Sequence, residues 1–67
     1  MSPQEKQLLS VIATRPRWLY RELLQRADDR FRGFLPSCID NLISAGLVEE
    51  SGEEIKATER GIELSKR

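Results

Sequence analysis

Apolar residues recur with helical spacing in four segments of the chain. The first segment opens with a strong start signal, because Ser2 can act as N-cap, Pro3 suits the first helical position and Glu5 can complete a capping box. Pro16 interrupts the pattern that follows and ends it near residue 14. This spacing predicts helices at about residues 3–14, 18–28, 36–45 and 59–65.

The second predicted helix is less well marked than the first. No capping residue precedes Trp18, which we expect to close the core, and Glu22 and Arg26 stand in the order that favours an ion pair on an exposed helix face. Gly33 and Pro36 then indicate a break of about eight residues before the third helix opens at Pro36.

The period of the pattern changes from helical to strand-like after Gly46, a residue suited to a left-handed helix stop. Two strand-like segments flank Ser51-Gly52-Glu53 and predict a hairpin at about residues 47–57. Thr58 can cap the last helix, in which Gly61 is intrinsically unfavourable. Together these elements predict one α+β domain over residues 1–67, mainly helical, with three helices, a two-stranded hairpin and a short C-terminal helix.

Two motifs carry a resemblance to a known family. They are Asn41-Leu42-Ile43-Ser44-Ala45-Gly46-Leu47-Val48 and Ile55-Lys56-Ala57-Thr58-Glu59-Arg60-Gly61. They resemble the end of the recognition helix and the exit from the wing in PadR-type and MarR-type bacterial transcription regulators. The resemblance implies a winged helix-turn-helix domain whose wing is the hairpin at 47–57. It also implies a small DNA-binding regulator, a repressor-like protein of bacterial or phage type.

Charge is unevenly distributed along the chain, although its 11 basic and 11 acidic residues cancel. Residues 15–32 carry a net charge of +3, with arginine as the only basic type, and residues 33–67 carry −3. The resemblance implies that the start of the second helix and the turn before the third lie near the DNA backbone. We therefore expect four arginines to contact phosphates, namely Arg17, Arg21, Arg30 and Arg32. On the helix at 36–45, the candidates for base contacts in the major groove are Ser37, Asn41 and Ser44.

Two features oppose DNA binding. The third predicted helix contains no lysine or arginine, and the hairpin carries four glutamates where a wing approaches phosphates. The alternative is a protein-interaction module that does not bind DNA and uses the hairpin and the turn from Phe31 to Phe34. Its candidate interface residues are Phe34, Glu49, Glu50, Glu53 and Glu54. Substitution of Arg30 and Arg32 by alanine separates the two hypotheses, because only DNA binding depends on these arginines.

The composition argues against several other classes of protein, namely enzymes, metal-binding proteins and membrane proteins. The chain has no histidine and one cysteine, and it shows no nucleophile with a base, no phosphate-binding loop and no metal constellation, so we expect no enzyme activity, catalytic residue, metal or cofactor. Cys38 on an apolar helix face is expected to be an inert core residue. No apolar run approaches about 20 residues, so the sequence predicts a cytoplasmic protein without a membrane segment. The expected partner is double-stranded DNA, with a homodimer or another protein as further possibilities.

Overall fold

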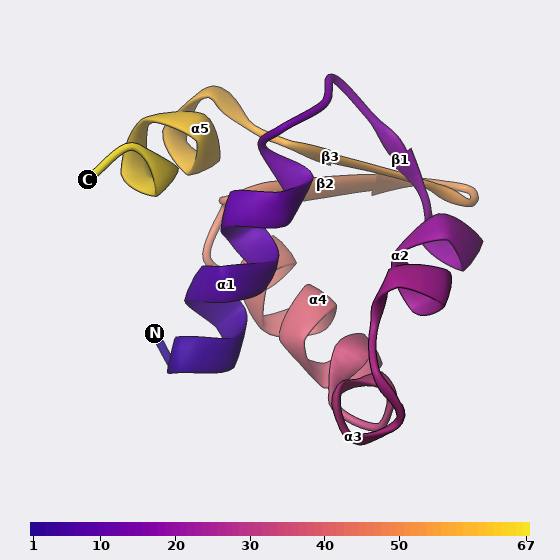
Figure 1. Ribbon diagram of the computed structural model, residues 1–67. Helices are drawn as coiled ribbons and strands as arrows, with labels where there is room; N and C mark the ends of the chain where they lie inside the picture. The colour runs from indigo at the N-terminus through magenta and orange to yellow at the C-terminus, as the bar shows by residue number, and fades with distance from the viewer.

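Five helices and one small antiparallel sheet make up the fold in the computed structural model, which describes residues 1–67 (Figure 1). The domain is α+β and mainly helical, as the sequence predicts. None of its helices combines the length and hydropathy needed to cross a membrane. In chain order the elements are α1 (Pro3–Ile12), β1 (Trp18–Leu19), α2 (Tyr20–Arg26), α3 (Asp29–Arg32), α4 (Leu35–Ser44), β2 (Val48–Ser51), β3 (Glu54–Ala57) and α5 (Glu59–Ser65).

Helix α1 begins with the predicted capping box. The Ser2 hydroxyl accepts a hydrogen bond from the Glu5 amide at 3.2 Å, and the Glu5 carboxylate accepts one from the Ser2 amide at 3.1 Å. Pro3 occupies the first helical position, where its missing N–H has no partner to lose. The helix ends at Ile12, two residues earlier than predicted, because the Thr14 amide donates to the Val11 carbonyl three residues back and so forms a tighter turn.

The predicted helix at 18–28 is wrong at both ends. Trp18 and Leu19 form strand β1, which pairs antiparallel with Ile55 and Glu54 of β3. The helix starts only at Tyr20, where the Glu22 carboxylate accepts a hydrogen bond from the Leu19 amide at 2.9 Å. It stops at Arg26. Without a side-chain cap before Trp18, pairing with a distant strand outweighs the local helical pattern.

A further helix occupies the segment where the sequence predicts only a break. The carboxylate of Asp28 accepts a hydrogen bond from the Phe31 amide at 2.7 Å and caps the single-turn helix α3. An Asp-Asp pair therefore starts a turn here, because a short acidic side chain satisfies free amides at a helix N-terminus. Helix α4 follows after Gly33 and Phe34 and begins at Leu35, one residue before the predicted start at Pro36.

The three strands form a sheet in the order β1-β3-β2. The predicted hairpin is confirmed, with Ser51 paired to Glu54 so that only Gly52 and Glu53 form the turn. Gly52 has φ +60°, which glycine adopts without the strain that a side chain adds. Strand β1, at the outer edge beside β3, is too short for its periodicity to predict it.

Twelve buried apolar residues form one core between the helices and the sheet. The fully buried indole of Trp18 confirms that this residue closes the core, and Cys38 lies inside it as expected. Leu35 is also fully buried, although the sequence suggests that it precedes the helix. The core residues are Leu8, Leu9, Ile12, Trp18, Leu23, Leu35, Cys38, Ile39, Leu42, Leu47, Val48 and Ile55.

Helix α5 depends on Gly61 for its position. Thr58 caps the helix by accepting a hydrogen bond from the Gly61 amide at 3.1 Å, and its hydroxyl donates to the Gly46 carbonyl at 2.7 Å. A Cβ atom on Gly61 would collide with the backbone carbonyl of Leu47. The glycine that the helical pattern disfavours is therefore required by close backbone packing.

Replacing Gly61 with alanine should destabilise the domain by about 1–3 kcal/mol, because backbone atoms must shift to admit the methyl group. The matched control is Gly33→Ala. There the nearest atom to a new Cβ is 3.8 Å away and the backbone is in the right-handed helical region. The control should be neutral or stabilising by up to about 1 kcal/mol. Urea unfolding of both variants measures the difference, and equal stabilities would contradict the packing at Leu47.

Candidate nucleic-acid interface

The first pair of predicted phosphate-binding arginines flanks β1, with Arg17 before the strand and Arg21 after it. Arg17 is exposed, and its guanidinium forms an ion pair with the carboxylate of Glu54 at 3.3 Å. Arg21 is exposed in the first turn of α2 and has no carboxylate within 4 Å. Of the two, Arg21 alone keeps its full charge available to an anion.

The second pair lies on α3, at the far end of α2 from the first pair (Figure 1). The Nε of Arg32 donates to the Leu24 carbonyl at 3.1 Å, and its Nη1 lies 3.6 Å from the Asp29 carboxylate. Arg30 is exposed and has no carboxylate within 4 Å. The four predicted arginines thus lie in two separate regions, one flanking β1 and one on α3, and one member of each pair is engaged within the protein.

The exposed face of α4 is polar but carries no cation. Ser37 and Ser44 are exposed, and neither hydroxyl makes a hydrogen bond inside the protein, in contrast to that of Ser10. Asp40 lies between them on the same face, since residues three to four apart are neighbours on a helix surface. Asn41, the third predicted base-contacting residue, instead donates from its amide to the Glu5 carboxylate at 2.7 Å. Its side chain joins α4 to α1.

This contact perturbs the titration of Glu5. The hydrogen bond from Asn41, followed in effect by the one from the Ser2 amide, lowers the pKa of Glu5 below its ordinary value of 4.5. Glu22 also has a lowered pKa, mainly because its carboxylate accepts a hydrogen bond from the Leu19 amide. In both cases the hydrogen bonds stabilise the ionised carboxylate, which accepts from a backbone amide at the start of its helix.

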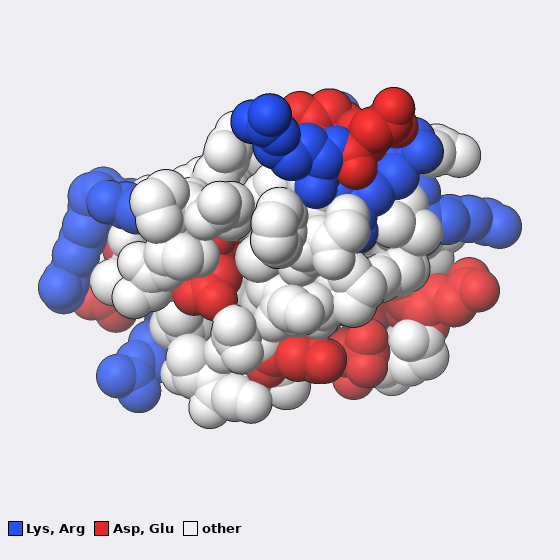
Figure 2. Space-filling view, turned by 90° about the horizontal axis from the view of Figure 1, so that it is seen from below, with Lys and Arg blue, Asp and Glu red and all other residues white.

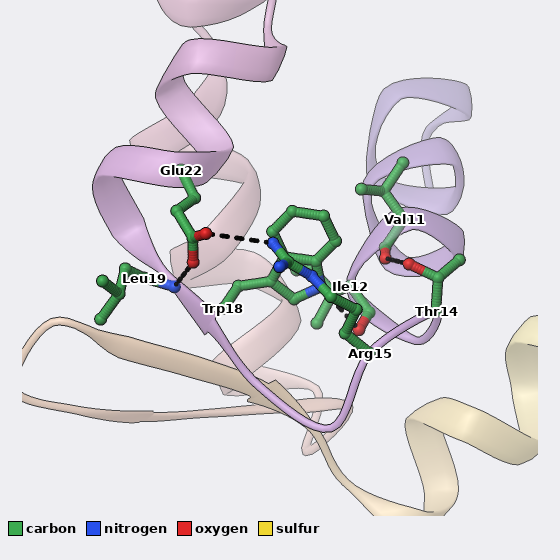
Figure 3. A network of polar contacts seen from close by, with 7 residues as sticks. All are labelled: Val11, Ile12, Thr14, Arg15, Trp18, Leu19 and Glu22. Atoms are coloured by element: carbon green, nitrogen blue, oxygen red, sulfur yellow. Dashed lines mark hydrogen bonds and ion pairs between the residues drawn. The ribbon is translucent and has the colours of Figure 1, made fainter.

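Two further arginines lie against Trp18, and Figure 3 shows the contacts of one of them, Arg15. The indole Nε1 donates to the Ile12 carbonyl at 3.1 Å, and the Arg15 guanidinium lies 3.5 Å from the centre of the indole ring. Arg15 also pairs with Glu22 at 3.3 Å, so the predicted ion pair between Glu22 and Arg26 is wrong. Arg26 instead lies 5.0 Å from the same ring. Arg15 and Arg26 therefore lie against the ring of Trp18, where a cation is attracted to the aromatic face.

The acidic hairpin is half neutralised. Glu49 pairs with Lys56 at 3.5 Å and Glu54 with Arg17 at 3.3 Å, whereas Glu50 and Glu53 have no cation within 4 Å. These pairs are exposed and contribute little to stability, but they reduce the local negative charge. Seen from below, basic and acidic side chains lie around the rim of the molecule, and uncharged atoms cover much of the middle (Figure 2).

An apolar groove lies between α1, α2 and α3, and it is named here the α1–α3 groove. It has a volume of about 270 Å³. Of the two phenylalanines of the predicted turn, Phe31 packs partly against the core, whereas the side chain of Phe34 is 51% exposed. The groove was not apparent in the sequence, because its walls come from three elements. Its lining residues are Gln4, Gln7, Leu8, Val11, Leu23, Arg26, Ala27, Asp28, Arg30, Phe31 and Phe34.

No group of three or more side chains of the metal-binding types lies close enough together to hold a metal ion. Burial, with a smaller effect from the charge of Glu5, raises the pKa of the Cys38 thiol. A raised pKa disfavours the thiolate, which is the reactive form of cysteine. Comparison with protein-family models, with curated proteins and with solved structures finds no match to this chain.

Replacing Asn41 with alanine should raise the pKa of Glu5 toward 4.5, while the pKa of Glu22 stays lowered. A lowered pKa in the folded state contributes stability above the unfolded value, and this contribution is lost as pH falls through the folded pKa. The variant should therefore lose less stability than the parent chain when the pH is lowered below about 4.5. Carboxyl carbon NMR titration measures both pKa values. Ser37→Ala on the same helix is the control and should move neither.

Proposed function

We propose that this chain is a winged helix-turn-helix domain that binds double-stranded DNA and acts as a small transcription regulator. The observation that carries the proposal is the arrangement of its elements. Helix α4 precedes a hairpin that pairs with β1 in the order β1-β3-β2, and the exposed face of α4 is polar. In winged helix-turn-helix domains the corresponding helix enters the major groove, and the hairpin lies beside it as the wing.

The free polar groups of α4 support a role in base contacts. Ser37 and Ser44 offer hydroxyls that can donate to or accept from a base edge, and the Asp40 carboxylate can accept from the amino group of cytosine. Asn41 is held by Glu5, so adenine contact through this residue requires that hydrogen bond to open. We therefore assign base contact to Ser37, Asp40 and Ser44.

In this proposal Arg21 is the main residue that contacts phosphates. It lies in the first turn of α2 and has no competing carboxylate, whereas Arg17 and Arg32 are already engaged and Arg30 lines the α1–α3 groove. Few phosphate contacts mean that affinity depends weakly on salt, because each contact releases about one counterion. The unpaired charges of Glu50 and Glu53 repel phosphates, so the hairpin stays away from the duplex in this proposal.

Replacing Arg21 with alanine should weaken binding to all DNA sequences several-fold and reduce the salt slope of the affinity by about 1. Lys66→Ala removes the same charge from the end of the chain and should change neither quantity. The measurement is a salt titration on DNA fragments selected from a genomic mixture by retention on the protein. Failure to retain any fragment at about 50 mM salt would overturn the proposal, since phosphate contacts are strong there.

A second candidate function is recognition of a basic protein by the hairpin. The observation that favours it is the pair of exposed, unpaired carboxylates of Glu50, which lies on β2, and Glu53, which lies in the turn. Opposite charges on two surfaces steer their association and select partners.

The double substitution Glu50→Lys and Glu53→Lys separates the two functions. If the domain binds DNA, removing two repulsive charges and adding two attractive ones should tighten binding and steepen its salt dependence. If the hairpin holds a basic protein, the same variant should lose that partner and gain nothing on DNA. Affinity for the selected DNA fragment, measured at two salt concentrations for parent and variant, distinguishes these results.

A further inference from the structure

The α1–α3 groove has the size of a site for individual side chains. Its volume of about 270 Å³ is below the roughly 300–1,000 Å³ of pockets that enclose a small molecule. Its apolar walls include Leu8 and Val11 from α1, Leu23 from α2 and Phe31 from α3. A cleft of this size between helices accommodates one or two bulky side chains that project from a longer segment.

Phe34 extends the apolar surface to the outside of the groove. Its side chain is 51% exposed, although it is one of the largest apolar residues of a chain with a small core. On α1 the groove is bordered by the amides of Gln4 and Gln7, which can donate and accept hydrogen bonds without bringing charge. An apolar floor with an exposed aromatic residue and a polar border is typical of surfaces that bind the apolar face of a helix.

The charged residues that line the groove favour a partner with negative charge. Arg26 and Arg30 both line it, and neither has a carboxylate within 4 Å; Arg26 lies against the Trp18 ring, a contact that leaves its charge without a counterion. Asp28 is the one acidic residue of the lining, and its carboxylate already accepts the hydrogen bond that caps α3. A partner with carboxylates beside its apolar side chains therefore gains two ion pairs that no residue of this chain provides.

We propose that the α1–α3 groove binds an acidic amphipathic helix of a partner protein. The apolar side chains of that helix, spaced at i, i+3 or i+4 and i+7, enter the groove and cover Phe34. Its flanking carboxylates pair with Arg26 and Arg30. This surface does not include Arg21 or the exposed residues of α4, so the partner and the DNA would bind to different residues of the chain.

Two synthetic peptides of about 16 residues, long enough for partial helicity, test the proposal. Both carry leucine and phenylalanine at the helical spacing, and they differ only in having glutamate or lysine at the flanking positions. Titration into the isotope-labelled full chain should shift the amide signals of groove residues. The acidic peptide should bind about tenfold more tightly, because it gains two exposed ion pairs where the basic peptide meets two like charges.

Variants locate the contact. Arg30→Glu should reverse the preference between the two peptides, and Phe34→Ser should weaken both about equally. Both residues are exposed, so the amide spectra of these variants should otherwise match that of the parent chain. Lys66→Glu makes the same change in charge away from the groove and should leave the preference unchanged.

Three results would overturn the proposal. They are equal binding of the two peptides, no amide shifts at millimolar peptide, and shifts confined to residues outside the groove. A dimer in sedimentation whose groove signals change on dilution would instead make a second copy of this chain the occupant. Titration of the same labelled sample with DNA should shift α4 signals, so failure of the peptide experiment and failure of DNA binding are observed separately.

Discussion

The indole of Trp18 links the last turn of α1 to the sheet and fills the core between them, where α1 also packs directly on β3. Its ring is buried, its backbone pairs with Ile55 in the sheet, and its N–H donates to the Ile12 carbonyl in the last turn of α1. Carbonyls at a helix end have no partner within the helix, so this bond removes a cost as well as fixing an orientation. Arg15 and Arg26 lie over the ring and shield it from water. One side chain therefore fixes the end of α1 against the sheet, in addition to the packing of α1 on β3 through the core.

Elements that carry their own start and stop signals could be predicted from the sequence. The capping box at Ser2, the glycine stop at Gly46 and the cap at Thr58 act within a few residues, and the structure confirms each of them. Strand β1 could not be predicted, because two residues show no period and their partners lie more than 30 residues away. The helical pattern wrongly included Trp18 and Leu19 for the same reason, although it is correct from Tyr20 to Arg26.

The candidate site was harder to predict than the fold, because charge counts do not reveal which charges are already paired. The sequence shows an arginine-rich segment and an acidic hairpin as two opposed regions. In the structure Arg17 joins them through Glu54, and Arg15 belongs to the cover of Trp18. Asn41 was a candidate for base contact on grounds of helix position, but its neighbour on α1 is Glu5, which only the packing of two helices brings near.

Phe34 connects the two surfaces on which the proposed functions depend. Its backbone precedes α4 as the N-cap, and its carbonyl accepts a hydrogen bond from the Cys38 amide at 2.9 Å, which starts the helix. Its side chain lines the α1–α3 groove and remains half exposed there. A segment bound in the groove therefore touches the residue that sets where α4 begins. Phe34 is followed directly by Leu35, which is fully buried and begins α4. A partner that shifts Phe34 therefore also acts on the start of α4, the helix that carries Ser37 and Asp40.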